Sequence, residues 1–80
     1  MGSENIGDNI LYVYPNPTSG LLTVKHTADS KIPYEITDIT GKLIQKGMLM
    51  EKQTNLDISK YVNGIYLLKI NEQTIKLTRQ

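Results

Sequence analysis

The pattern that decides the fold lies in the stretch LDISKYVNGIYLLKI, residues 56–70. Side chains of a β-strand point alternately to its two faces, so apolar residues at every second position mark a strand with one buried face. The last six residues of the stretch follow this rule with Tyr66, Leu68 and Ile70. They form the strongest predicted strand of the chain, 65–70.

Leu56 and Ile58 imply another inward face at the beginning of the same stretch. Between the two faces, residues 59–64 predict a short helical turn that is closed by Asn-Gly. This succession resembles the corner where a chain crosses between the two sheets of an immunoglobulin-like sandwich. At such a corner the Tyr66 hydroxyl would form a hydrogen bond to nearby backbone.

Outside this stretch, apolar residues also alternate in short bursts that are separated by turn residues, and no segment sustains a helical period. The further predicted strands are 11–14, 21–26, 34–38, 42–46, 48–51 and 74–79. Gly47 predicts a break or bulge between two of them. We therefore expect an all-β, immunoglobulin-like antiparallel β-sandwich of about seven strands.

The segment YPNPTSG, residues 14–20, combines several turn-forming residues. Pro15 ends the first strand because proline has no N–H to donate. Asn16 can bond the backbone beyond it, Pro17 presets the φ angle, and Gly20 can adopt a positive φ. The sequence predicts a rigid turn here and a second, tight reversal at residues 38–41.

Composition excludes several classes of function. The chain carries a net charge of +1, whereas generic attraction to nucleic acid needs clustered Lys and Arg. It has no cysteine, which excludes thiol catalysis and cysteine zinc sites. No apolar run approaches the roughly 20 residues of a membrane-spanning helix, so we expect no membrane insertion. We expect one domain over 11–80, preceded at 1–10 by a tag remnant and a linker.

The side chains suited to catalysis are too few and too dispersed. His26 is the only histidine, and we expect it to be a surface residue at the end of a strand. Glu35 and Asp38 are three positions apart, which places them on opposite faces of one strand and prevents acid–base cooperation. The sequence therefore predicts no enzyme, no metal site and no cofactor.

Tyrosine is the only aromatic residue type, at positions 12, 14, 34, 61 and 66. Without Trp or Phe, tyrosine is expected to supply the bulky part of the core. Tyr12 and Tyr14 point the same way on one strand, so a platform for sugar or peptide is the alternative interpretation.

Four segments, taken in order, carry a family resemblance: VYPNPTSG at 13–20, YEITD at 34–38 with Gly41-Lys42, NGIYLLKI at 63–70 and KLTRQ at 76–80. They resemble the type A C-terminal sorting domain of the type IX secretion system, also called the Por secretion system. The resemblance implies a seven-stranded immunoglobulin-type sandwich. It also implies a C-terminal signal that directs a larger cargo protein across the outer membrane of a Gram-negative bacterium.

The same resemblance implies a route and partners. The cargo would reach the periplasm through its own signal peptide, and the domain would then meet the outer-membrane translocon with its shuttle and sortase components. A sortase-like peptidase would remove the domain and attach the cargo to an anionic lipopolysaccharide, so the protein would be secreted or held at the cell surface. The cleavage site would lie at the start of the domain, near the polar segment 4–10.

The motif residues of the family correspond to Tyr14, Pro15, Asn16, Pro17, Gly20, Asp38, Gly41, Gly64 and Tyr66. We assign most of them to the fold. The basic last strand is the exception, because outward charges on an edge strand resist aggregation and attract an acidic receptor. We expect Lys76, Arg79 and Lys69 to form the recognition surface. The alternative is an accessory or spacer domain of a surface protein that binds carbohydrate or protein.

Overall fold

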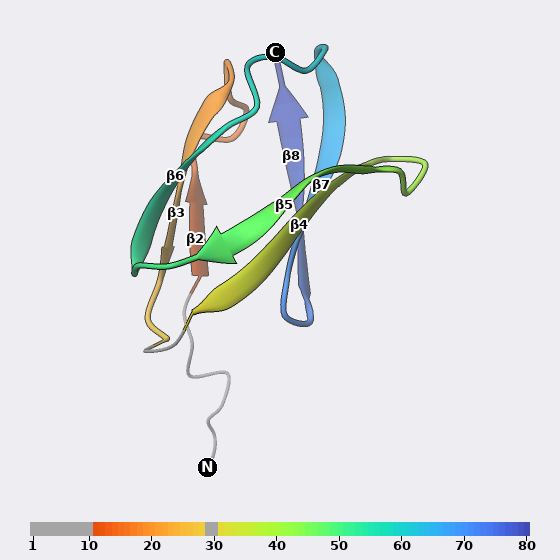
Figure 1. Ribbon diagram of the computed structural model, residues 1–80. Helices are drawn as coiled ribbons and strands as arrows, with labels where there is room; N and C mark the ends of the chain where they lie inside the picture. Colours follow the sequence, from red (N-terminus) through yellow and green to blue (C-terminus); the bar gives the residue numbers. More distant parts are fainter. Residues whose placement is uncertain (1–10, 29–30) are drawn as a thin grey trace.

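The protein folds as two β-sheets that face each other (Figure 1). The computed structural model describes residues 11–28 and 31–80, and within these ranges the chain forms strands and turns but no helix. The described residues contain seven strands: β2 (Leu11–Tyr14), β3 (Leu21–His26), β4 (Ile32–Asp38), β5 (Leu43–Leu49), β6 (Gln53–Asp57), β7 (Gly64–Ile70) and β8 (Gln73–Arg79). The predicted tag and linker at 1–10 lie outside the described residues.

One sheet has the strand order β2-β3-β6, and the other has the order β5-β4-β7-β8. All neighbouring strands are antiparallel. The chain changes sheet after β3, after β5 and after β6, so each sheet combines segments that are distant in sequence. This architecture confirms the predicted all-β fold and is consistent with an immunoglobulin-like sandwich.

Alternate residues of both sheets point inward and form one apolar core. Val24 and Leu56 come from the three-stranded sheet, while Ile36, Leu68 and Leu77 come from the four-stranded sheet. Each is at most 5% exposed. Because a buried aliphatic side chain contributes about 1.5–3 kcal/mol, this layer is the main source of stability. Truncation of Leu68, on the inner strand β7, to Ala would cost about 2–5 kcal/mol.

The corner between β6 and β7 contains the predicted tyrosine contact. The Tyr66 hydroxyl donates a hydrogen bond to the Val62 carbonyl oxygen at 2.5 Å. The predicted turn is present, but it is a single turn without a helix, in which the Tyr61 N–H donates to the Ile58 carbonyl oxygen at 3.1 Å. The chain then enters β7 at Gly64.

The predicted break at Gly47 is also wrong. Strand β5 continues through Gly47, which pairs with Tyr34 on β4. A Cβ atom at this position would lie 3.0 Å from Tyr34 Cε2, so the glycine makes room for the tyrosine ring. The register shift lies instead earlier in β5, where Ile44 has no partner between Gln45, which lies opposite Ile36, and Leu43, which lies opposite Thr37. The predicted strands 42–46 and 48–51 are therefore one strand.

His26 is buried, which corrects the prediction of a surface histidine. It is the last residue of β3, and it is 6% exposed. Strand alternation places it on the same inner face as Leu22 and Val24. Neither ring nitrogen has a hydrogen-bond partner among the residues that the structure describes. The imidazole therefore acts as a core side chain in this fold.

Candidate recognition surface

The turn that follows β2 lies along the outer edge of the last strand, β8. Asn16 Nδ2 donates to the Lys76 carbonyl oxygen at 2.7 Å, and Asn16 Oδ1 accepts from the Thr78 N–H at 3.1 Å. Thr18 continues the contact in a parallel bridge, with its N–H 2.8 Å from the Thr78 carbonyl oxygen and its own carbonyl oxygen 2.8 Å from the Gln80 N–H. The turn therefore occupies backbone groups that an edge strand would otherwise expose.

Gly20 joins the same turn to the corner after β6. Its φ angle is 138°, and a Cβ atom would lie 2.6 Å from Ser59 Cβ. The Gly20 carbonyl oxygen accepts a hydrogen bond from the Ile58 N–H at 2.7 Å. Only glycine fits both the backbone conformation and the available space. The turn motif at 14–20 thus holds the two sheets together at one end of the sandwich.

Arg79 is half-buried and fully engaged within the domain, which corrects the expectation that it is exposed and free of packing. Its guanidinium donates to the Ser59 carbonyl oxygen at 2.8 Å and to Asn63 Oδ1 at 2.9 Å. Its Nε donates to the Ile58 carbonyl oxygen at 3.3 Å. These bonds attach the end of β8 to the β6–β7 corner, so the side chain has a structural task.

The predicted reversal at residues 38–41 is confirmed, and Asp38 organises it. One carboxylate oxygen accepts hydrogen bonds from the Thr40 hydroxyl at 2.6 Å, the Thr40 N–H at 2.9 Å and the Lys42 N–H at 3.0 Å. The bond from the Thr40 hydroxyl is the main reason why the pKa of Asp38 lies below its ordinary value. Gly41 completes the turn with a φ angle of 94°. This part of the family motif therefore shapes the hairpin.

The outer face of the four-stranded sheet carries the exposed charges. In the strand register, Glu35 on β4 lies opposite Lys46 on β5 and opposite Lys69 on β7, so the three residues form one row across three strands. Lys76 on β8 lies opposite Leu67 on the same face. All three lysines and Glu35 are exposed. We call this surface, with Lys46, Lys69 and Lys76, the basic face.

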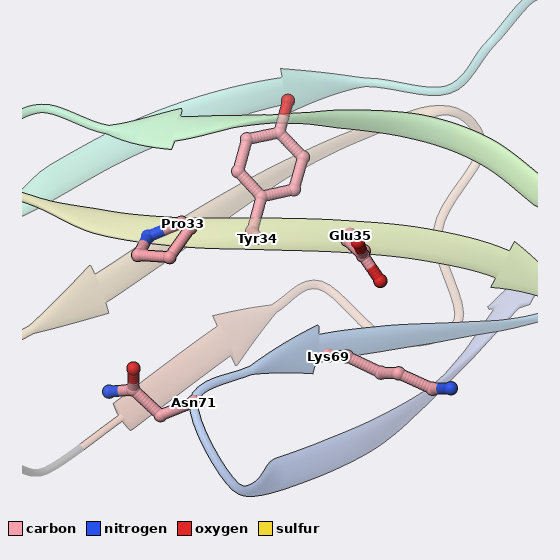
Figure 2. Close-up of a pocket in the computed structure, with 5 residues that line it drawn as sticks. All are labelled: Pro33, Tyr34, Glu35, Lys69 and Asn71. Carbon is pink, nitrogen blue, oxygen red and sulfur yellow. The ribbon is translucent and has the colours of Figure 1, made fainter.

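Two shallow hollows lie on the basic face, one on each side of β4. The first has a volume of about 260 Å³ and is lined by Pro33, Tyr34, Glu35, Lys69 and Asn71 (Figure 2). The second also contains Pro33, Tyr34 and Glu35, and adds Lys46, Gly47 and Met48. Each hollow therefore has one lysine in its lining and shares the same carboxylate.

Lys46 was missed from sequence because it looks like an ordinary polar position of a hairpin. Its importance comes from strand register, which places it beside Glu35 and in line with Lys69. The structure also separates the predicted recognition residues: Lys69 and Lys76 share the basic face, whereas the Arg79 guanidinium is bound at the corner. Cross-strand position rather than sequence spacing defines the surface.

The tyrosines divide between core and surface. Tyr34 and Tyr66 are buried and Tyr61 is half-buried, as predicted, but Tyr12 and Tyr14 are 57% and 45% exposed. The latter two lie on the outer face of the three-stranded sheet, so the core prediction is wrong for them.

Residues 11–28 and 31–80 contain no group of three or more His, Cys, Asp or Glu side chains placed to hold a metal ion. In the same ranges, no helix has the length and apolar character needed to cross a membrane.

In a comparison with protein families, the family model described as the secretion system C-terminal sorting domain matches residues 12–80. This range includes strands of both sheets and the turn that lies along β8. Neither the search of curated proteins nor the search of solved structures gave a match.

Proposed function

This chain belongs to the family of secretion-system C-terminal sorting domains, and from that premise we propose that the type IX secretion machinery recognises it through the basic face. Membership makes the domain a C-terminal sorting signal for a cargo protein that passes the outer membrane and is secreted or displayed on the cell surface. An accessory or spacer role is not favoured. The proposal concerns which surface carries the signal.

The observation that carries this proposal is the difference between engaged and free polar groups. The Asn16 side chain forms its hydrogen bonds with β8, and the Arg79 side chain donates hydrogen bonds to the β6–β7 corner. The side chains of Lys69 and Lys76 are exposed and have no described partner. Charges that no internal contact requires are available to a receptor, and they favour an acidic one. Recognition is therefore assigned to Lys69 and Lys76, with Arg79 as a positioning residue.

In this account the domain folds in the periplasm, after its cargo has crossed the inner membrane through a separate signal peptide. It then presents the basic face to the outer-membrane translocon or to its shuttle component. A sortase-like peptidase separates the domain from the cargo, which becomes attached to an anionic lipopolysaccharide. Cleavage before Leu11, near the start of the domain, would leave both described sheets intact.

The test uses matched charge reversals in a reporter that ends in this domain, expressed in a bacterium with a type IX system. The Lys69→Glu/Lys76→Glu variant changes the basic face, whereas Lys25→Glu/Lys42→Glu makes the same change of net charge at exposed lysines on β3 and at the β4–β5 turn. We expect the first variant to accumulate in the periplasm and the second to be exported like the wild type. Equal export of both folded variants would contradict the proposal.

A further inference from the structure

The Lys46–Glu35–Lys69 row has three charges of alternating sign that remain unpaired. These residues face each other in register on adjacent strands, yet none of them has a hydrogen bond or an ion pair in the described part of the chain. Figure 2 shows Glu35 and Lys69 on neighbouring strands at the edge of the first hollow. Cross-strand pairing alone therefore does not account for the order of the charges.

We propose that the Lys46–Glu35–Lys69 row selects the partner by charge pattern: it binds a protein surface that presents two carboxylates with a cationic or amide donor between them. This inference rests on the proposed recognition role of the basic face. Each carboxylate side chain enters one hollow and meets the lysine there, while the donor meets Glu35. Because adjacent strands are about 4.8 Å apart, Lys46 and Lys69 require carboxylates about 10 Å apart.

The shape of the surface supports this pairing. The two hollows lie on opposite sides of β4 and share Pro33 and Glu35, so a partner that fills both must pass over Glu35. An entirely acidic partner would place a carboxylate against Glu35, which costs binding free energy through like-charge contact and desolvation. Glu35 therefore acts against uniformly acidic surfaces and favours an alternating one.

Apolar contacts lie directly beside the row. Pro33 on β4 pairs with Met48 on β5, and Met48 is 47% exposed. Both residues belong to the second hollow, so the aliphatic part of a partner side chain can pack there while its carboxylate reaches Lys46. A polar row next to exposed apolar side chains is a common composition for a transient protein interface.

The discriminating variant exchanges two charges of the row. Lys46→Glu/Glu35→Lys keeps the net charge and still places one Lys and one Glu opposite each other on β4 and β5. It changes the order of charges along the row from plus-minus-plus to minus-plus-plus. The control is Lys42→Glu/Glu72→Lys, an exchange of two exposed charges outside the row. The readout is the initial rate of appearance of the reporter outside the cell, with folding of each variant checked by urea denaturation.

We expect the row exchange to slow export about threefold or more, because two exposed charge contacts with the partner change from attraction to repulsion. Glu35→Gln alone should also slow export, because the donor on the partner then meets a neutral amide instead of a carboxylate. The control exchange should leave the rate unchanged. Export of Glu35→Gln at or above the wild-type rate would overturn the alternating pattern. If Lys69→Glu/Lys76→Glu still blocks export in that case, the proposed function stands and only this inference fails.

Discussion

The side-chain nitrogen of Asn16 donates a hydrogen bond to the backbone oxygen of Lys76, which lies 60 positions later in the chain, at 2.7 Å. The same carboxamide accepts from the Thr78 N–H, so a side chain replaces a neighbouring strand along this part of β8. The family motif at the start of the domain is therefore bound to the strand that carries Lys76. The sequence motif and the proposed recognition surface are thus linked by hydrogen bonds from the Asn16 side chain to the backbone of β8.

Replacement of Asn16 by Ala removes both hydrogen bonds to β8. At about 0.5–1.5 kcal/mol for each bond, we expect a loss of about 1–3 kcal/mol in the free energy of unfolding, measured by urea denaturation. Asn55→Ala is the control, because Asn55 accepts a single exposed bond from the Thr23 hydroxyl. Hydrogen exchange at the Thr78 amide should also become faster. A loss for Asn16→Ala no larger than the control, with unchanged exchange, would show that the carboxamide does not protect this edge.

Gly20 and Gly41 both have a positive φ, but only Gly20 lies close to another residue, so the two positions distinguish the cost of backbone strain from the cost of steric overlap. Gly20→Ala places a methyl group against Ser59 in addition to the unfavourable φ, and we expect it to cost about 2–5 kcal/mol. Gly41 has nothing within 4 Å of the corresponding position, so Gly41→Ala should cost only about 1–2 kcal/mol. Thermal unfolding of the two variants measures the difference. Equal melting temperatures would argue against the close approach of Gly20 and Ser59.

Tyr66→Phe keeps the buried ring and removes only the hydroxyl. The lost bond to the Val62 carbonyl oxygen should lower the free energy of unfolding by about 1 kcal/mol. Tyr12→Phe serves as the matched control, because Tyr12 is 57% exposed and has no described partner. We expect the control to stay within about 0.5 kcal/mol of the wild type. Indistinguishable denaturation curves for the two variants would remove the tyrosine contact from the account of the corner.

Stability should decrease in acid because of two turn carboxylates. Hydrogen bonds from the Thr40 hydroxyl to Asp38 and from the Ser59 hydroxyl to Asp57 are the main causes that hold both pKa values below 3.8. A pKa that is lower in the folded state adds stability at pH values above 3.8, and this contribution is lost as the pH falls through the folded-state pKa. Melting temperatures between pH 6 and pH 2 should therefore fall less steeply for Asp38→Asn/Asp57→Asn than for the wild type. Parallel profiles would contradict this role.

Strand alternation was sufficient to predict most of the fold. The inward faces of β7 and β8 followed from apolar residues at every second position, and the Tyr66 hydroxyl contact followed from the corner pattern. Gly47 was misinterpreted because a glycine within a strand can mark a bulge or make room for a neighbouring ring, and only the pairing with Tyr34 distinguishes the two. The residues around Gly47 in the sequence do not show that it lies opposite Tyr34.

The recognition surface was less predictable, because it depends on contacts between distant segments. Arg79 lies in a basic strand, so the sequence predicts that its charge is exposed. In the structure, its guanidinium donates hydrogen bonds to the β6–β7 corner. Lys46 belongs to the basic face because the register of β4 with β5 and β7 aligns it with Glu35 and Lys69. His26 was assigned to the surface because strand ends are commonly exposed, whereas here it lies on the inner face of β3 and is buried.

The most direct measurement is the location of a fluorescent reporter that carries a periplasmic signal peptide at its N-terminus and residues 11–80 of this chain at its C-terminus. It is expressed in a bacterium with a type IX system and in the isogenic strain that lacks the translocon. The account predicts that the reporter reaches the medium or the cell surface only when the translocon is present. Periplasmic retention of the folded fusion in both strains would contradict it.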